Sequence, residues 1–109
     1  MKIDIIKMLI IFDEQLPLSN EEEGSYWFKT SRKDNLIITC AISIYESTTA
    51  ITLYDNSEKA IASLHFKNCS EINVLDEKRK FLEILHNEGN GRCFISLQGN
   101  PIFQCTEEK

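Results

Sequence analysis

The side chains that could do chemistry in this chain are a histidine and a cysteine seven positions apart, His86 and Cys93. A cysteine nucleophile needs a nearby base, and the glycine-containing turn between the two residues could bring them together. Cys93 also lies in an alternating apolar segment, where cysteine behaves as a small hydrophobic residue. The sequence therefore favours a buried core cysteine and a surface histidine over a small enzyme that uses this pair.

Adjacent acidic residues are a second possible source of chemistry, as in Asp13 with Glu14 and Asp76 with Glu77. Acid–base catalysis needs two carboxyl groups held several ångströms apart in different environments. Neighbours in a loop are instead solvated charges of similar character. The sequence also lacks the motifs of nucleotide-binding loops, serine hydrolases and zinc proteases. We therefore expect a protein that is not an enzyme and has no cofactor.

The cysteine spacing does not suggest a metal site. The four cysteines include no closely spaced pair of the kind that binds zinc, and neither histidine lies near one. Spacing alone leaves two disulfides open, because connectivity cannot be read from a sequence. The N-terminus lacks the pattern of a secretory signal, and no run approaches the ~20 apolar residues of a membrane span. We expect a cytoplasmic protein with reduced cysteines, no metal and no membrane contact.

An acidic run beside aromatic residues is the strongest candidate for a binding site. Glu21, Glu22 and Glu23 are followed by Tyr26 and Trp27. The aromatic residues at 26–28 cannot all face one core if they lie on a strand, so one of them could anchor a basic partner. The alternative is that residues 26 and 28 fill the core while Trp27 covers a sheet edge. A second acidic turn adds further candidates, Asp55 and Glu58.

The overall charge limits the classes of partner. The 12 Lys and Arg residues against 17 Asp and Glu residues give a net charge of −5. A direct nucleic-acid binder needs a dense basic face to displace counterions, so we do not expect one. An acidic domain can attract a basic protein, because opposite fields speed encounter and favour correct pairing.

Most of the chain reads as antiparallel strands in a single domain of residues 1–109. Residues 36–45 alternate between an apolar face and a more polar face, which is typical of a half-buried strand. Residues 49–54 and 60–66 repeat this pattern after short polar turns, which predicts a meander. Further strands are expected at 3–12, from 26, at 92–97 and at 102–105, with a loop at 13–24 between the first two. For residues 3–12 a helix is the alternative, because Ile5, Met8, Leu9 and Phe12 match a helical stripe.

One segment favours a helix. Leu75, Lys78, Phe81, Leu82 and Leu85 have helical spacing, and Asp76 with Glu77 would suit a helix N-terminus. A strand over 81–85 that pairs back across the turn at 87–91 is the alternative. The predicted fold class is mainly β to α+β, a single-domain antiparallel sheet (meander, curved sheet or sandwich) with about one short helix.

The C-terminal third resembles a known class of small protein. Residues 74–84, VLDEKRKFLEI, and 91–97, GRCFISL, lie in a block (72–104) that resembles immunity proteins of bacterial contact-dependent inhibition and related polymorphic toxin systems. The resemblance implies an acidic, cytoplasmic, often β-rich protein that forms a heterodimer with a cognate toxin domain, often a basic nuclease. It would block the active site or substrate groove of that toxin. A small acidic secretion chaperone or adaptor is the alternative.

Overall fold

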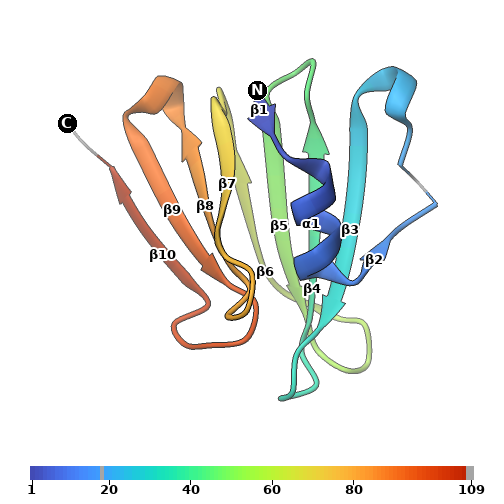
Figure 1. Cartoon of the computed structure of the whole chain (residues 1–109). Coiled ribbons are helices and arrows are strands. Elements are labelled where there is room, and N and C mark those ends of the chain that lie inside the picture. Colours follow the sequence, from blue (N-terminus) through green and yellow to red (C-terminus); the bar gives the residue numbers. More distant parts are fainter. Residues whose placement is uncertain (18, 108–109) are drawn as a thin grey trace.

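Over residues 1–17 and 19–107, the computed structural model of the protein contains two five-stranded sheets, named here sheet A and sheet B (Figure 1). Sheet B has the order β2 (Glu14–Gln15), β3 (Ser25–Ser31), β4 (Ile37–Ser43), β5 (Thr48–Tyr54) and β6 (Ala60–Phe66). Sheet A has the order β1 (Lys2–Ile3), β7 (Glu71–Asp76), β8 (Phe81–His86), β9 (Gly91–Ser96) and β10 (Phe103–Glu107). The helix α1 (Ile5–Phe12) and the 3-10 turns η1 (Glu21–Glu23) and η2 (Asn87–Gly89) complete the elements. The predicted mainly β, α+β class is confirmed.

Sheet B is the predicted meander, and its neighbouring strands are all antiparallel. Ile38, Cys40 and Ile42 of β4 are buried, while the residues between them are only half-buried. Ile51 and Leu53 of β5 face the same core, as the alternation predicts. The register fixes which side chains share a row across the sheet, and therefore which of them face solvent together.

The helix predicted between residues 75 and 85 is wrong, and the alternative strand is correct. β7 and β8 pair antiparallel and are joined by a turn at 77–80, in which Lys80 has a φ of 52°. Asp76 accepts a hydrogen bond from the backbone N–H of Arg79, which supports the turn. β8 pairs back onto β9 across η2. Apolar residues on both faces of β8 imitate helical spacing, because Leu82 points inward while Phe81 lies half-buried on the outer face.

The strand predicted at residues 3–12 is also wrong, since most of this segment forms α1. Asp4 caps the helix by accepting a hydrogen bond from the backbone N–H of Lys7. Met8, Ile11 and Phe12 follow at helical spacing and are fully buried. The cap and the buried stripe therefore outweigh the strand preference of the isoleucines. The predicted loop at 13–24 is interrupted by β2 and η1.

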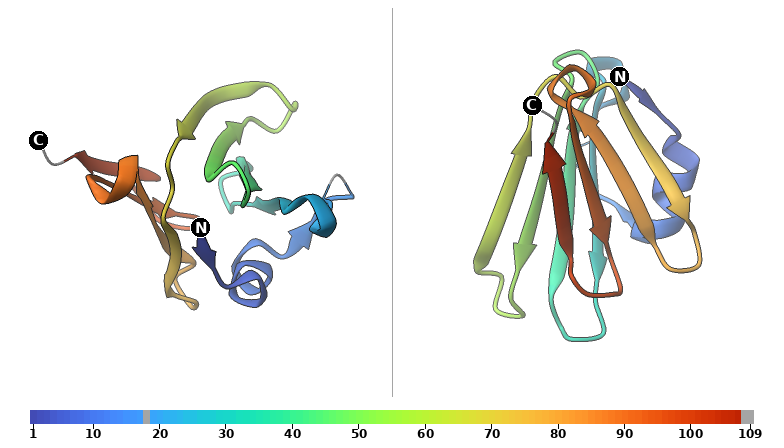
Figure 2. Two further views of the ribbon diagram at one scale, coloured as in Figure 1. Left: turned by 90° about the horizontal axis from the view of Figure 1, so that it is seen from above. Right: turned by 90° about the vertical axis from the view of Figure 1, so that its left-hand side faces the viewer.

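One apolar cluster joins the two sheets and the helix. Phe12 of α1 stacks on Phe28 of β3 with ring centroids 5.7 Å apart, and Leu82 and Ile95 meet this cluster from sheet A. Figure 2 shows the sheets as two sides of a wedge, with the chain crossing from β6 to β7 and with α1 on the side between β7 and β3. Burial of this cluster is what holds the sheets together.

Arg32 connects the turns at the ends of the two sheets. Its side chain is 3% exposed and donates hydrogen bonds to the backbone oxygens of Ser96 and Gly99, at 3.1 and 3.0 Å. The same guanidinium forms an ion pair with Asp34 at 3.2 Å. A buried cation that satisfies two carbonyl groups and a carboxylate orders the β3–β4 turn against the β9–β10 turn.

The cysteines do not all behave as expected. Cys93 and Cys105 form a disulfide between β9 and β10, so the expectation of four reduced cysteines is wrong for this pair. The register explains the bond, because the two residues lie directly opposite each other. Cys40 and Cys69 are free and buried, and desolvation raises the pKa of each thiol.

Replacing Arg32 by methionine should lower the free energy of unfolding by about 3 kcal/mol, because the buried guanidinium and its hydrogen bonds to the backbone oxygens of Ser96 and Gly99 are lost. Arg32→Lys keeps a cation and should recover part of that loss. Equilibrium urea unfolding measures both variants. Equal stability of Arg32→Met and the parent protein would show that the connection contributes little.

Thiol titration with a chromogenic disulfide reagent should separate the two classes of cysteine. The native protein should react slowly, because Cys40 and Cys69 are buried. Denaturation without reductant should expose two thiols, and denaturation after reduction should expose four. Four reactive thiols without prior reduction would contradict the disulfide.

Candidate protein-binding surface

The three predicted glutamates form an ordered acidic turn at the start of β3. Asn20 caps η1 by accepting hydrogen bonds from the backbone N–H groups of Glu22 and Glu23. Gly24 ends the turn in the left-handed region, with a φ of 65°. All three carboxylates are exposed, so the short turn presents them to solvent from a fixed backbone.

Hydrogen bonds join this turn to the other loops at the same end of the molecule. The backbone N–H of Ile44 donates to the oxygen of Gly24 at 2.8 Å, and the Tyr45 hydroxyl donates to the oxygen of Glu22 at 3.4 Å. Beyond this turn, the N–H of Cys69 donates to the oxygen of Ser47 at 2.8 Å. The N–H of Glu88 in turn donates to the oxygen of Asn68 at 3.2 Å. The loops therefore form one connected edge.

We call the exposed glutamates of this edge the acidic rim: Glu21, Glu22, Glu23, Glu46 and Glu88. Within residues 1–17 and 19–107, none of the five forms an ion pair. Lys67 contributes a positive charge at this end, and Lys2 lies 3.8 Å from Glu71. The rim is therefore a region of uncompensated negative charge, which attracts cations over distances of about 10 Å at moderate salt.

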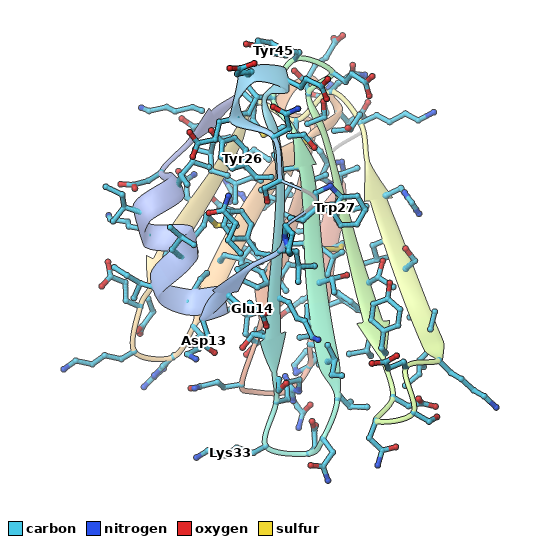
Figure 3. The ribbon with its side chains drawn as sticks, turned by 90° about the vertical axis from the view of Figure 1, so that its right-hand side faces the viewer. Asp13, Glu14, Tyr26, Trp27, Lys33 and Tyr45 are labelled. Atoms are coloured by element: carbon cyan, nitrogen blue, oxygen red, sulfur yellow. A yellow bond between two sulfur atoms is a disulfide. The ribbon has the colours of Figure 1, made fainter. Side chains whose placement is uncertain are left out.

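Trp27 and Tyr26 lie on opposite faces of β3. Tyr26 points inward, half-buried, and stacks on Phe28 with centroids 6.3 Å apart. Trp27 is half-buried on the outer face of sheet B, where Figure 3 shows it below Tyr45 and the rim. Residues 26 and 28 thus support the core, as in the second of the two sequence interpretations. Of the three aromatic residues at 26–28, Trp27 is the one on the outer face of sheet B.

The register places Trp27 in a row with small residues and a second ring. Trp27 lies opposite Ala41, Ala41 opposite Ala50, and Ala50 opposite His65. A hollow of about 290 Å³ lies over this row. Its lining continues toward the rim through Ser25, Ser43 and Thr48.

The structure does not bring Asp55 and Glu58 to this site. Both lie in the β5–β6 turn, about 20 Å from the rim along the seven residues of β5. The backbone N–H of Lys59 and the hydroxyl and N–H of Ser57 donate to the Asp55 carboxylate and lower its pKa. The Asp55 carboxylate therefore orders its own turn, and the two acids form a separate, distant group.

Sequence reasoning missed three contributors to the surface. Tyr45, which is 74% exposed, looked like the last residue of a strand, although it lies in the β4–β5 turn. Glu46 and Glu88 are single acids in separate turns, and only the pairing of the strands brings them to one edge. A useful signal was available for Tyr45, because the polar turn residues Glu46 and Ser47 follow it directly.

A second hollow, of about 460 Å³, lies on the outer face of sheet A. Phe81 and Phe94 stack there with centroids 5.6 Å apart, and Lys78 and Arg79 line the same hollow. Asp76 lines the hollow too and pairs with Arg79, which leaves a net positive charge from Lys78, so this hollow is less suited to a basic partner than the rim. No cluster of three or more potential metal ligands occurs within the part of the chain that the structure describes.

Comparison with known proteins establishes the fold. No protein-family model and no curated protein matches the sequence. A chain of the contact-dependent growth inhibition toxin–immunity protein complex from Klebsiella pneumoniae 342 has a similar structure, with a TM-score of 0.72 and 13% sequence identity. The match covers 98% of this chain and 95% of that chain, so the whole arrangement of both sheets is shared. The predicted resemblance to proteins of these systems is confirmed at the level of the fold.

Gly24→Ala should lower the free energy of unfolding by about 1–2 kcal/mol, because the turn needs a positive φ and a Cβ would lie 3.1 Å from the Tyr45 ring. The loss should shrink in a Tyr45→Ala background, as measured by urea unfolding. Gly89→Ala is the control, since a Cβ there has no neighbour within 4 Å despite a φ of 91°. The same loss with and without the Tyr45 ring would refute this contact.

Proposed function

We propose that this chain is an immunity protein that binds a cognate toxin domain as a heterodimer and neutralises it stoichiometrically, in the cytoplasm. The fold shared with a chain of a toxin–immunity complex supports this function, and we assign this chain the immunity role. The protein makes and breaks no bond in this role. It works by presenting a preformed surface to another macromolecule.

The toxin domain we propose as partner is a basic nuclease. A nuclease must be electropositive where it holds phosphate groups, so an acidic surface can occupy the same groove. The acidic rim meets this requirement with five glutamates that lack ion pairs among the described residues. Binding there would occlude the active site or the substrate groove of the toxin.

The observation that carries this proposal is the meeting of the acidic rim with an uncharged sheet face. Outward positions of β4 and β5 hold no charged side chain: Ile37, Thr39, Ala41, Ser43, Thr48, Ala50, Thr52 and Tyr54. Protein interfaces commonly combine such a charge-poor centre, often with an aromatic anchor, and a polar border. Trp27 supplies the anchor and the rim supplies one border.

The rival nucleophile pair gains no support. The sulfur of Cys93 is bonded to Cys105, and the His86 ring packs against Phe66 with centroids 4.8 Å apart. A thiol held in a disulfide cannot act as a nucleophile. These contacts favour a binding role.

A secretion chaperone or adaptor remains the second candidate because α1 exposes an apolar stripe. Ile6 is 72% exposed and Ile10 is 51% exposed, with Leu9 beside them. Such chaperones dimerise through apolar elements, but stable interfaces use roughly 20–30 residues a side, and this stripe supplies three.

Within the described residues, no helix combines the length and apolar character needed to cross a membrane.

Removing the charges of each acidic group in turn should show whether the rim or the distant β5–β6 turn binds the toxin. Replacing Glu21, Glu22 and Glu23 together by glutamine should slow association with the toxin domain encoded beside this gene by about tenfold at low salt. Stopped-flow mixing or surface plasmon resonance measures the rate, and rescue of toxin-expressing cells measures protection. The matched control is Asp55→Asn with Glu58→Gln, which should leave both readouts unchanged.

Two outcomes would overturn this assignment. Wild-type protein that neither binds the neighbouring toxin nor protects cells would remove the proposed function. A larger effect from the control pair than from the rim variant would move the binding surface to the opposite end of sheet B. The chaperone alternative predicts a dimer in solution, whereas the immunity role predicts a free monomer, and light scattering distinguishes them.

A further inference from the structure

The hollow on sheet B has a floor that can receive one flat side chain. Ala41 and Ala50 lie side by side in its central row, with Trp27 and His65 at the two ends. Neighbouring strands are about 4.8 Å apart, so the bases of the two rings, three strand spacings apart, are separated by about 14 Å across the two alanines. Burial of an alanine side chain costs no conformational entropy, and burial of a serine costs little. A partner can therefore cover the floor of the hollow at a small entropic cost.

The groups around the hollow favour a positively charged ligand. Ser25 and Ser43 line its upper end, and Ser25 follows the acidic turn with only Gly24 between them. Glu46 lies in the turn that joins Ser43 to Thr48, so both loops above the hollow carry carboxylates. A group that enters between these loops meets hydroxyl acceptors and a negative field.

Trp27, which forms one wall of the hollow, favours a planar ligand group. The indole of Trp27 offers the most favourable of all ring faces for stacking a cation. A guanidinium is flat and weakly hydrated, stacks on aromatic rings and can still donate hydrogen bonds at its edge. The compact, strongly hydrated ammonium of lysine cannot stack in this way.

We propose that this hollow binds an arginine side chain of the toxin domain, with its guanidinium stacked on Trp27 above Ala41 and Ala50. The inference rests on the function proposed above and names the partner group that the site takes. His65 closes the far end of the row, where its Nε2 lies 3.2 Å from the hydroxyl of Ser63. That contact holds the ring along β6.

Two neighbouring charges oppose this assignment: Lys67 follows β6 at the rim end, and Lys29 of β3 is partly offset. Lys29 follows Trp27 by two residues on the same face of β3, about 7 Å away along the strand. The register places Glu14 of β2 opposite Lys29, so a carboxylate lies beside the Lys29 ammonium and partly offsets its charge. Repulsion by Lys29 therefore favours a guanidinium that enters the hollow from the rim end, where Glu21 to Glu23 lie.

Short peptides test the site without the toxin. The probes are acetyl-Gly-X-Gly-amide peptides in which X is arginine, lysine, citrulline or phenylalanine, titrated into the isotope-labelled full chain. Trp27 is the single tryptophan, so its indole N–H gives one identifiable NMR signal. The arginine peptide should shift this signal and the Ala41 and Ala50 amides, with a dissociation constant on the order of millimolar.

The arginine peptide should bind at least about threefold more tightly than each of the other three. Equal binding of the citrulline peptide would show that charge is irrelevant, and equal binding of the lysine peptide would show that planarity is. Tighter binding of the phenylalanine peptide would assign the hollow to an aromatic group. Each of these results, or shifts centred elsewhere on the protein, overturns the proposal.

Matched variants locate the binding on the ring. Trp27→Leu should weaken the arginine peptide at least about fivefold at the Ala41 and Ala50 amides. Tyr54→Leu removes an aromatic side chain from the same face at the other end of β5 and should change nothing. Thermal unfolding checks that both variants fold, and Trp27→Phe, which should weaken binding less, serves if the leucine variant does not.

Toxin binding separates failure of this inference from failure of the proposed function. If the rim variant loses the toxin while Trp27→Leu keeps full affinity, the immunity role stands and the arginine site is wrong. If the toxin does not bind at all but the arginine peptide occupies the hollow, the guanidinium site stands and the immunity role is wrong. Loss of toxin affinity in both variants, with selective binding of the arginine peptide, supports both.

Discussion

The alternation of side chains between the two faces of sheet B is the constraint on which the rest of this molecule depends. Phe28, Ile38 and Ile51 must point inward to build the shared core with sheet A and α1. A shift of one residue in any strand would reverse its faces and expose that core. The same register fixes the outer row from Trp27 to His65. The register that packs the core therefore also determines which side chains form the candidate binding surface.

The loops at the rim show how a small domain can offer fixed charges. Each turn is short, and backbone hydrogen bonds link one loop to the next, from Gly24 through Ile44 and from Ser47 to Cys69. A partner then does not have to order these backbones when it binds, which reduces the entropic cost of association. At the other end of the sheets, Arg32 performs a similar ordering task with its side chain.

Much of the fold could be predicted from the sequence, and the failures have physical causes. The meander of β4 to β6 could be predicted because apolar and more polar residues alternate along these segments of the sequence with a period of two. The segments of α1 and β8 were misassigned because apolar residues on both faces satisfy either period, and Asp4 as a cap was the overlooked signal. At the candidate site, the exposure of Glu21 to Glu23 and the outward position of Trp27 agree with local sequence, and their role in binding stays a prediction. Glu46, Glu88 and the distance to Asp55 depend on strand order, which local patterns do not contain.

The uneven distribution of ion pairs has a consequence for how the molecule moves before contact. At the end opposite the rim, Lys80 lies 3.1 Å from Asp13 and Arg79 lies 3.9 Å from Asp76, so charges there largely cancel at a distance. The rim glutamates remain uncancelled, which gives the domain a permanent electric dipole. In the field of a cationic body such a dipole experiences a torque. That torque would bias the domain to turn its rim toward such a body during diffusion.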